Sequence, residues 1–386
     1  MEHSFDTPPT VLFGAGARFR LSEELKRLGV ARILVVSDNH LVQTGVIDTF
    51  QSQLRNENIE ATIFSDVQPD PTDVNVLAGL EMLRQCGAEA LVAVGGGSVI
   101  DAAKIISIAV ENPGPLSQFQ GYHQIPKPGI PLVVIPTTAG TGSEATKAAV
   151  ITDTARQVKM MILDRKIMPR TSIVDYELTL TMPQSLTAHV GIDTLVHAIE
   201  AFVSKKAFGM TDSLAVSCIR LTSRYLPVAY REGGNREARE AMALAACQGG
   251  MAFTNSSVCL VHGMSRPIGA VFHLPHGLSN AVLLPTVTRF SVPGAPARYA
   301  RVAREMGLAS EDQDDDDACG ALIEGLEQFN HQLGVLRLRD YVGRSQSEFE
   351  SHLPKMASDA VASGSPQNNP VVPSADEIVQ LYKQAW

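Results

Sequence analysis

Short apolar runs rich in β-branched residues recur in the first half of the chain, each bounded by glycine, proline, aspartate or serine. They lie at residues 32–37, 60–64, 90–95 and 132–136. Runs of this length and composition predict strands that are buried on both faces, as in a parallel sheet. Between them, residues 39–56 and 73–87 repeat apolar positions at three- and four-residue spacing, which predicts helices. This alternation predicts a doubly wound α/β sheet.

The hydrophobic pattern changes near residue 180. Further strand-like runs occur up to that point, at residues 147–152, 159–163 and 171–175. Beyond it come long stretches rich in alanine and leucine with helical periodicity, at residues 185–206, 212–230 and 236–253. Pro183 stands where the first of these helices is expected to begin. We therefore predict an α/β domain over residues 1–180 and an all-helical domain over residues 181–386.

The composition is that of a packed globular protein of 386 residues, with 45% hydrophobic and 19% charged residues. Its formal net charge of −9, without any basic run, argues against a nucleic-acid partner. Residues 1–17 contain neither a signal-peptide pattern nor an apolar span of membrane length, so we expect no membrane partner. Five scattered cysteines without a CxxC pair indicate a reducing cytoplasm.

Two polar segments lie near the end of the chain. The acidic tract at residues 311–317 is expected to be a solvated loop or the entry to a helix, with a metal site as the weaker alternative. Residues 363–374 are rich in turn-forming residues and predict a connector before a last helix over residues 376–386.

A glycine-rich turn follows the third predicted strand, in the segment VAVGGGSVIDAAK. Gly95, Gly96 and Gly97 lead into a helix that is expected to open at Ser98. Glycines let a backbone approach a diphosphate closely, and the free N–H groups of a helix start favour an anion. We interpret the turn as a phosphate site, although its spacing is not GxGxxG and a purely structural turn is the alternative.

A second polar turn follows the fourth predicted strand, in the segment IPTTAGTGSEAT. Small hydroxyl residues there suit a pyrophosphate or a ribose lying across strand ends, and a plain polar turn is the alternative. These residues are Thr137, Thr138, Thr141 and Thr146. Asp38, at the end of the first strand, is placed to accept a hydrogen bond from a ribose 2′-hydroxyl. A helix N-cap is its competing role, and the two roles are compatible.

Side chains that suit a metal ion occur in the helical half. In GIDTLVHAIE, Asp193 and His197 are four residues apart, so one helix presents both on the same face. An ordinary hydrogen-bonded pair is the more common outcome of that spacing. His262, His273 and His276 fall close together in an apolar segment further on. Two of these imidazoles with Asp193 and His197 make an N3O set that leaves a coordination position open for substrate.

Taken together, the motifs resemble the iron-containing (group III) alcohol dehydrogenases. The resemblance is carried by GGGSVIDAAK, PTTAGTGSE, GIDTLVHAIEAF, HGMSRPIGAVFHLPHG and the NNP segment at residues 368–370, over nearly the whole chain. It implies a dehydroquinate-synthase-like fold, in which a dinucleotide-binding parallel-sheet domain precedes an all-helical metal-binding domain. It also implies a homo-oligomer and metal binding by Asp193, His197, His262 and His276, with Fe2+ as the usual metal and Zn2+ in some members.

The same resemblance implies NAD as the cofactor, since an acidic residue at Asp38 would repel the 2′-phosphate of NADP. The cofactor-binding residues that follow from the motifs and from the resemblance are Asp38, Asp70, Gly96, Gly97, Ser98, Asp101, Thr137, Thr138, Thr141, Thr146, Val150 and Lys159. Asp70 replaces an asparagine of some relatives, which weakens its transfer as a cofactor contact.

One departure from the family pattern concerns the substrate. Many relatives carry a histidine four residues after the first late ligand, proposed to relay a proton, whereas this chain has Arg266 there. We take His273 as a substitute for that histidine and Arg266 as a residue that receives a carboxylate, phosphonate or sulfonate on the substrate. The alternative for Arg266 is an ion pair at the surface or between domains.

The function implied is a metal-dependent oxidoreductase that interconverts a small alcohol and its aldehyde or ketone with NAD(H). The metal would stabilise the substrate oxygen while hydride moves to or from nicotinamide. Rival interpretations are a maleylacetate-reductase-like enzyme, a dehydroquinate-synthase-like lyase and a non-catalytic binding protein. The intact ligand set and glycine turn, and the lack of a Lys/Arg cluster near the ligands, argue against these rivals.

Overall fold

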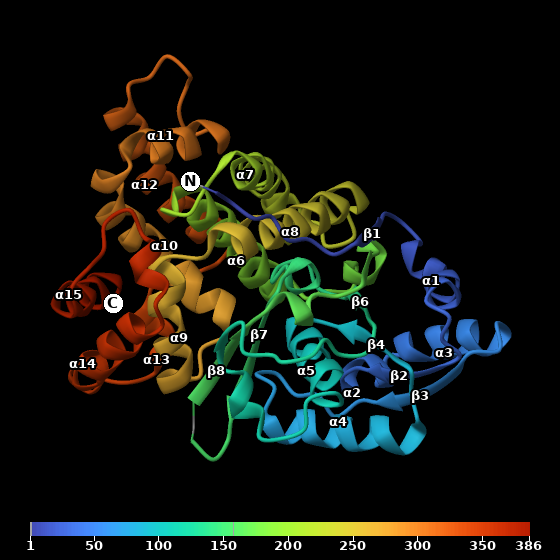
Figure 1. Cartoon of the computed structure of the whole chain (residues 1–386). Helices are drawn as coiled ribbons and strands as arrows, with labels where there is room; N and C mark the ends of the chain where they lie inside the picture. Colours follow the sequence, from blue (N-terminus) through green and yellow to red (C-terminus); the bar gives the residue numbers. More distant parts are fainter. Residues whose placement is uncertain (1, 157) are drawn as a thin grey trace. The chain divides into compact units, whose positions relative to one another are not determined.

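A computed structural model describes residues 2–156 and 158–386. The chain divides into two compact units. One unit comprises Asp6–Thr179, here called the α/β unit, and the other comprises Leu180–Trp386 with the first residues of the chain up to Phe5, here called the helical unit. Figure 1 shows strands only in the first of these units and helices in both.

A six-stranded sheet forms the centre of the α/β unit in the described part of the chain, with neighbouring strands parallel. Its order is β1 (Thr10–Phe13), β9 (Thr171–Val174), β6 (Leu132–Pro136), β4 (Ala90–Gly95), β2 (Arg32–Val36) and β3 (Glu60–Phe64). The four predicted parallel strands are confirmed as β2, β3, β4 and β6. The sequence did not predict β1, because this edge strand is short and only half-buried.

Helices cover both faces of this sheet because each central strand alternates its side chains between them. Ile33 and Val35 belong to one apolar core with residues of α1 (Leu21–Arg27) and α3 (Val46–Asn56). Leu34 and Val36 belong to the other core, with residues of α4 (Asp73–Cys86) and α5 (Gly97–Ala109). Burial on both faces explains the unbroken apolar runs of the sequence.

The stretch 39–56 forms two helices rather than one. A short α2 (Asn39–Gln43) ends before Gly45, which adopts the left-handed conformation with φ 76° and precedes α3. Glycine adopts this conformation without the steric cost that a Cβ brings. The helical periodicity of the stretch is therefore confirmed, with a turn inside it.

A second, three-stranded sheet joins β5 (Gly121–Tyr122), β8 (Val158–Leu163) and β7 (Ala148–Asp153). β7 and β8 pair antiparallel, whereas β5 and β8 pair parallel. The strands predicted at 147–152 and 159–163 are confirmed, and the run at 171–175 is β9 of the main sheet.

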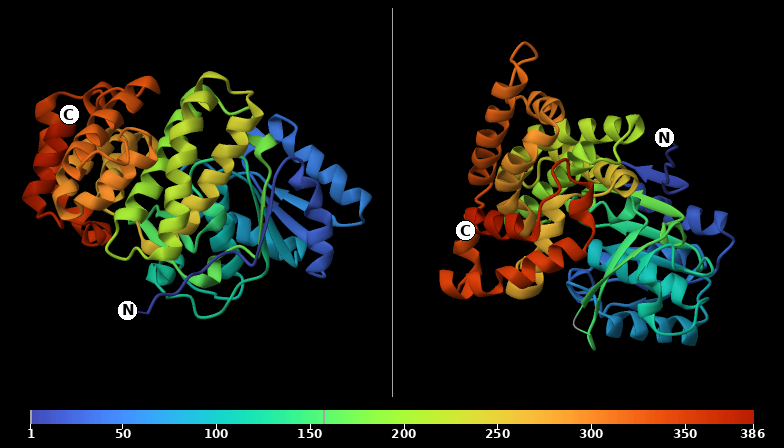
Figure 2. Two further views of the ribbon diagram at one scale, coloured as in Figure 1. Left: turned by 90° about the horizontal axis from the view of Figure 1, so that it is seen from above. Right: turned by 60° about the vertical axis from the view of Figure 1, so that its left-hand side comes forward.

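The helical unit begins with three long helices, α6 (Gln184–Val203), α7 (Gly209–Arg231) and α8 (Arg236–Ser256), which pack side by side (Figure 2). The remaining helices are α9 (Leu260–Phe272), α10 (His276–Ser291), α11 (Pro296–Glu305), α12 (Asp315–Gln332), α13 (Leu338–Val342), α14 (Gln346–Ala362) and α15 (Ala375–Ala385). The described residues of this unit form no strand. The predicted α/β plus all-α fold class is confirmed.

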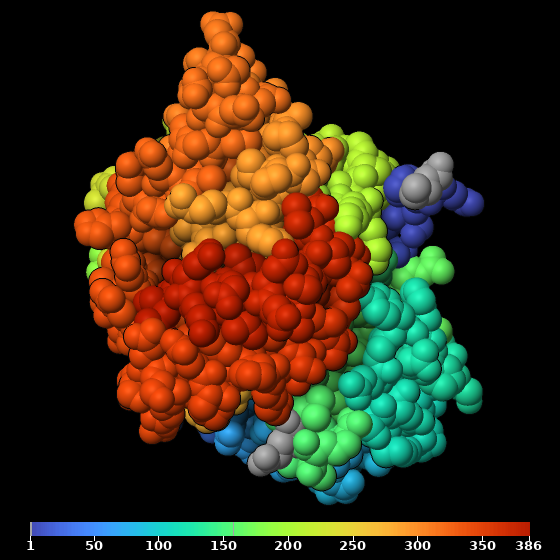
Figure 3. Space-filling model, turned by 90° about the vertical axis from the view of Figure 1, so that its left-hand side faces the viewer, coloured from blue at the N-terminus to red at the C-terminus, as the bar shows by residue number. Residues whose placement is uncertain are grey.

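Several predicted helix ends are also confirmed. Pro183 is the N-cap residue of α6, and the last helix, α15, follows the connector at 363–374. The acidic tract is a helix entry, because Asp314 caps α12 with its side chain and Asp315–Asp317 fill the first turn. In Figure 3 the C-terminal helices, drawn in red, form a continuous part of the surface of the helical unit.

α6 is long and apolar enough to cross a membrane by length and composition alone. Within its most apolar window, 83% of the residues are buried inside the protein. This degree of burial is what a core helix of a packed unit shows. Two of the metal-ligand candidates, Asp193 and His197, belong to α6.

Candidate metal and cofactor sites

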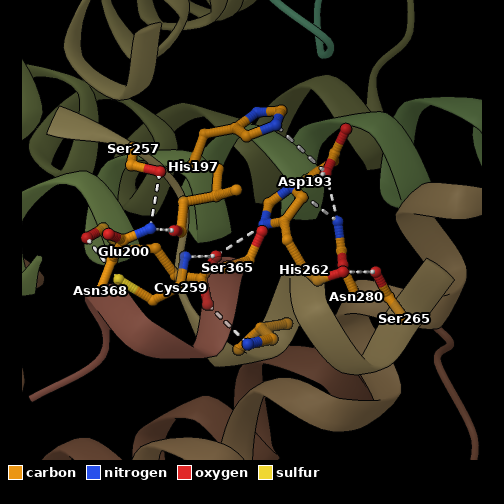
Figure 4. Close-up of polar contacts among 12 residues, drawn as sticks. Asp193, His197, Glu200, Ser257, Cys259, His262, Ser265, Asn280, Ser365 and Asn368 are labelled. Carbon is orange, nitrogen blue, oxygen red and sulfur yellow. Dashed lines mark hydrogen bonds and ion pairs between the residues drawn. The ribbon is translucent and has the colours of Figure 1, made fainter. Parts of the chain in front are cut away.

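Three of the predicted metal ligands lie together in the helical unit. One ligand atom each from Asp193, His262 and His276 falls within 4.8 Å of the other two. They come from α6, α9 and α10, respectively. His197, one turn after Asp193 on α6, places Nε2 3.8 Å from Oδ1 of Asp193 (Figure 4). The structure therefore brings the three predicted histidine ligands around the Asp193 carboxylate.

Two local features produce this arrangement. On α6, the spacing of Asp193, His197 and Glu200 puts all three on one face of the helix. At the start of α10, Gly277 lies against the backbone of α6, where a Cβ would come within 2.3 Å of the carbonyl oxygen of His189. Only glycine permits this approach, which sets His276 beside Asp193.

The ligand set is mostly buried. The side chains of Asp193 and His262 are each 3% exposed and that of His197 is 6% exposed, whereas that of His276 is 43% exposed. Burial alone would raise the pKa of Asp193, but His197, His276 and His262 outweigh it and lower this pKa. Burial would likewise lower the pKa of His262, but the neighbouring carboxylates of Asp193 and Glu200 raise it. The carboxylate is therefore ionised among imidazoles.

Glu200 contacts one ligand directly and was not predicted from the sequence. Its Oε2 lies 2.6 Å from Nδ1 of His262, while its two carboxylate oxygens accept hydrogen bonds from the backbone N–H groups of Cys259 and Val261. Figure 4 shows Glu200 and Asp193 on opposite sides of the His262 ring. The only signal in the sequence is its position one turn after His197 on the same helix face.

Asn280 was also missed. Its amide Nδ2 lies 2.6 Å from Oδ1 of Asp193, 3.2 Å from Nε2 of His262 and 3.3 Å from Nε2 of His276. The residue is fully buried, and its Oδ1 finds no hydrogen-bond partner among the described residues. The amide thus points its N–H groups at the lone pairs that a metal ion would use.

The geometry of these side chains fits a divalent metal. Nε2 atoms of three histidines lie 3.6–3.8 Å from Oδ1 of Asp193. Ligand atoms about 2.1 Å from a tetrahedral metal are separated by about 3.4 Å, which is close to these three distances. His197 lies outside the group of ligand atoms within 4.8 Å of one another, so its side chain would have to move towards the other three to bind the same ion. Three imidazole nitrogens and one carboxylate oxygen suit Fe2+ and Zn2+ alike.

Five of the predicted cofactor residues lie at one edge of the main sheet. Asp38 follows β2, Gly96 and Gly97 follow β4, and Thr137 and Thr138 follow β6. These strand ends are adjacent, because β4 pairs with both β2 and β6. The chain leaves β2 towards β3 and leaves β4 towards β6, which is the switch point where doubly wound folds bind nucleotides.

The helix after the glycine turn begins one residue earlier than predicted. The helix opens at Gly97 with Gly96 as its N-cap residue, one position before Ser98. A Cβ on Gly97 would meet the side chain of Thr141 at 2.8 Å. The two polar turns are therefore in contact, and Gly96, Gly97, Ser98, Thr138 and Thr141 are all partly exposed. Asp38 accepts a hydrogen bond from the backbone N–H of Leu41 and so caps α2, which is the alternative role predicted for it.

A buried network holds the second polar turn on α5. The Lys104 ammonium donates to the Ser143 carbonyl, to the hydroxyls of Ser143 and Thr146, and to the Ala148 carbonyl. Asp101 accepts from the hydroxyl of Ser143 and from the N–H of Val150. Lys104 and Asp101 of α5 therefore hold the segment that contains Thr146 and Val150 by hydrogen bonds. Lys104 was missed, although it closes the quoted motif GGGSVIDAAK.

Burial shifts the ionisation of this network. It raises the pKa of Asp101, lowers the pKa of Lys104 to about 8 and raises the pKa of Glu144 to about 7. Asp70 and Lys159, two further predicted cofactor residues, form an ion pair with Nζ 2.7 Å from Oδ1, and Asp70 has a positive φ of 54°. The Asp70 side chain is 71% exposed and that of Lys159 is 28% exposed.

The two predicted catalytic residues have structural partners or roles. Arg266, on α9 and half-buried, donates from Nη1 to Oγ of Ser365 at 2.9 Å. His273 is the C-cap residue of α9, with a left-handed φ of 57°, and is exposed. Their catalytic roles stay predictions.

A metal-ligand cluster on a helical unit and a doubly wound sheet with glycine and threonine turns at its strand ends are features of a nucleotide-dependent metal enzyme. Family models for iron-containing alcohol dehydrogenases match residues 8–176, and for the C-terminal part of that family residues 187–386. The chain belongs to the iron-containing alcohol dehydrogenase family.

Relatives match over the full chain. The NAD-dependent methanol dehydrogenase of Bacillus methanolicus is 38% identical over 99% of both chains. A solved 1,3-propanediol oxidoreductase superposes with a TM-score of 0.96 at 36% identity, covering both chains fully. The sulfoacetaldehyde reductase of Bifidobacterium kashiwanohense, solved with NAD+, has a TM-score of 0.89 at 28% identity and covers 100% and 99% of the chains. The predicted family and enzyme class are confirmed.

Proposed function

We propose that this protein is an NAD-dependent alcohol dehydrogenase that interconverts a small alcohol and its aldehyde or ketone at one divalent metal, with Fe2+ as the first choice and Zn2+ as the second. The observation that carries the proposal is the clustering of three imidazoles around the ionised, buried Asp193. A divalent metal at such an N3O set supplies Lewis-acid chemistry, polarising the substrate oxygen for hydride transfer.

The residues of the helical unit would prepare that chemistry in three ways. Asp193, His197, His262 and His276 would hold the ion, with Asp193 supplying the single negative charge. The burial of the first three keeps water from the far side of the site, while the exposed edge at His276 leaves one side open to substrate. Two neighbouring side chains, Glu200 and Asn280, bond to the ligand side chains directly.

NAD would bind at the carboxyl edge of the main sheet and supply or receive the hydride. The N–H groups at the start of α5 favour the pyrophosphate, because the free donors and the helix dipole attract an anion. Ser98, Thr137, Thr138 and Thr141 offer hydroxyl donors nearby. Asp38 still has a second carboxylate oxygen for a ribose hydroxyl while Oδ1 caps α2.

Asp101, Thr146 and Val150 support this site from below, because their hydrogen-bond partners belong to the α5 network rather than to the open edge. Asp70 and Lys159 are proposed as contacts at the outer rim of the cofactor site, where their exposed ion pair is accessible. A test of this division is NAD binding by Gly97→Ala. Its Cβ collides with Thr141, so the dissociation constant for NADH should rise at least tenfold while metal affinity stays unchanged.

A substrate with an acidic group is the narrower proposal. Arg266 replaces a family histidine and lies four residues after His262 on α9, on the same side of the helix. Its Nη1 donates to the neutral hydroxyl of Ser365 at 2.9 Å, and a guanidinium can bind a carboxylate or sulfonate through two parallel hydrogen bonds. The solved sulfoacetaldehyde reductase acts, by its name, on an aldehyde with a sulfonate, which makes this substrate class reasonable for a relative. His273 is proposed as the proton-relay substitute.

Compartment and assembly belong to the same proposal. The five cysteines are free thiols, in keeping with a reducing cytoplasm. A homodimer or larger homo-oligomer is proposed from the family resemblance, and light scattering coupled to size-exclusion chromatography measures it directly.

NADH oxidation by anaerobically purified, Fe2+-loaded protein tests the function. The panel contains short aldehydes, half of them neutral and half carrying a carboxylate or sulfonate. Turnover on at least one aldehyde, lost with chelator and restored by metal, is the expected result. Turnover that is indifferent to chelator contradicts the metal role, and no turnover on any aldehyde favours the lyase or non-catalytic alternative.

A further inference from the structure

Glu200 is a buried carboxylate with three donors around it. Its side chain is 4% exposed, and among the described residues it accepts from the N–H of Cys259 at 2.9 Å and of Val261 at 2.6 Å, and contacts Nδ1 of His262 at 2.6 Å. The two backbone donors belong to the start of α9, while Glu200 belongs to α6. One side chain therefore links the two helices that supply three of the four proposed ligands.

The contact with His262 determines which imidazole nitrogen faces the ligand cluster. A carboxylate can only accept, so Nδ1 must carry the hydrogen. A neutral imidazole with hydrogen on Nδ1 has its lone pair on Nε2, and that atom lies 3.6 Å from Oδ1 of Asp193. The lone pair is therefore directed towards the cluster. A carboxylate partner also makes the imidazole a more basic ligand.

The contacts with Cys259 and Val261 fix where α9 begins. Cys259 is the N-cap residue of α9, and its own side chain makes no capping hydrogen bond. Glu200 satisfies N–H groups that the helix leaves open and adds a negative charge at its N-terminus. Just before it, Ser257 has a positive φ of 76°, and Asn368 donates to Ser257 and Val258. The start of α9 is thus held from both sides.

We propose that Glu200 is a positioning residue of the metal site, which acts on the metal through His262 by fixing its hydrogen on Nδ1 and its ring orientation. The proposal rests on the proposed metal function. A simpler role is that of a remote helix cap whose loss would disturb α9 without acting through His262. The two roles differ in one measurable respect, because only the first requires His262 to be present.

A double-mutant cycle on metal affinity separates them. The dissociation constant for Zn2+ or Co2+ is measured by chelator competition on metal-depleted wild type, Glu200→Gln, His262→Gln and the double variant. The glutamine side chain of Glu200→Gln keeps the shape but can direct its NH2 group at Nδ1, which pushes the hydrogen of His262 to Nε2. In the wild-type background Glu200→Gln should weaken binding about 10–100-fold.

In the His262→Gln background the same change should weaken binding less than about threefold, because the side chain through which Glu200 acts is gone. An equal factor in both backgrounds overturns the proposal and leaves the helix cap. If the wild type itself binds no metal, the proposed function fails instead, so the two failures are distinguishable. The Co2+ absorption bands report the ligand geometry independently of activity. They should shift when Glu200→Gln is introduced into the wild type, but not when it is added to His262→Gln.

Two further variants keep the test decisive. Glu305→Gln changes another buried carboxylate of the helical unit, which pairs with Arg220 and Arg301. It should leave metal affinity unchanged even if the protein becomes less stable. If Glu200→Gln does not fold, Glu200→Asp retains the charge with a shorter reach, and should weaken metal binding in the wild-type background but not in the His262→Gln background. Metal affinity of Glu200→Asp equal to wild type contradicts the proposal.

Discussion

The amide nitrogen of Asn280 lies 2.6 Å from the carboxylate Oδ1 of Asp193 and within 3.3 Å of Nε2 of both His262 and His276. Each imidazole Nε2 has a single lone pair, so the amide N–H groups and a metal ion cannot both use it, whereas the carboxylate oxygen of Asp193 can accept the hydrogen bond and bind the ion. The ligand set is therefore organised by a neutral donor group, whose contacts with the two imidazoles must be lost when a metal binds.

The variant Asn280→Asp tests this relationship. It sets a second carboxylate beside Asp193, and like charges in a buried site destabilise the metal-free protein. Bound metal removes that repulsion, so Zn2+ should raise the unfolding midpoint more in the variant than in the wild type. Thermal unfolding with and without Zn2+ measures both. A smaller metal-induced shift in the variant than in the wild type would show that the amide hydrogen bond to Asp193 is needed with metal bound.

The contact between Gly277 and α6 predicts an effect at a distance from the ligand atoms. Gly277→Ala places a Cβ about 2.3 Å from the carbonyl oxygen of His189, so α10 must move away from α6 and carry His276 with it. Metal affinity should fall at least tenfold and the free energy of unfolding by about 1–3 kcal/mol. Gly320→Ala is the matched control, because no described atom lies within 4 Å of that position in α12. Unchanged metal affinity in Gly277→Ala would contradict the packing argument.

Loss of a ligand should remove activity without unfolding the protein. His262→Ala or His276→Ala removes one imidazole from the Asp193 cluster and opens the site to water. Metal-dependent turnover should fall below detection, while circular dichroism stays close to that of the wild type. Full turnover by either variant would mean that the metal is held elsewhere.

The α/β unit should show a pH dependence that comes from Glu144. Burial raises its pKa from 4.5 to about 7, so the folded protein keeps a proton there between those values while the unfolded chain loses it. The contribution of Glu144 to stability therefore falls as pH rises from about 4.5 to 7, by up to about 3 kcal/mol. Lys104, whose pKa burial lowers to about 8, stays protonated in this window.

Glu144→Gln removes that titration. Its unfolding midpoint relative to wild type should therefore rise between pH 5 and pH 7, when both metal-depleted proteins are measured in parallel. A midpoint difference that is flat with pH, or that falls, would contradict the assignment of a raised pKa to this side chain.

Arg266 makes a prediction about substrate choice. If its guanidinium receives an anionic group, Arg266→Ala should raise KM chiefly for acidic aldehydes. The resulting loss in kcat/KM should correspond to about 1.5–3 kcal/mol of transition-state stabilisation. Neutral aldehydes of the same length serve as the internal control. Equal losses on both kinds of substrate would indicate that the bond to Ser365, and with it the position of α9, is what the substitution disturbs.

The sequence predicted those helices and strands whose hydrophobic pattern directly reflects which of their faces are buried. The central strands read as continuous apolar runs because helices cover both sides, and α6 to α8 read as long amphipathic helices. β1 escaped notice because an edge strand with half-exposed side chains has no such run. The turn at Gly45 inside a helical pattern was equally invisible to periodicity alone.

At the site, sequence reasoning found the residues whose chemistry is distinctive and missed their supports. Histidines clustered in an apolar segment stand out, whereas Glu200 and Asn280 are ordinary residues until folding sets them beside His262 and Asp193. Lys104 was missed because a lysine inside a helix pattern predicts a solvated face, yet here four acceptors surround its buried ammonium. The partner of Arg266 lies 99 residues away, beyond what spacing can indicate.

Metal titration of the depleted protein, with NADH-dependent aldehyde reduction recorded at each step, tests the central claim most directly. We predict that metal-free protein is inactive and that activity rises linearly with added Fe2+ or Zn2+ to a plateau at one ion per chain. Activity of the fully depleted protein equal to that of the loaded protein would contradict a metal-dependent alcohol dehydrogenase built on Asp193, His197, His262 and His276.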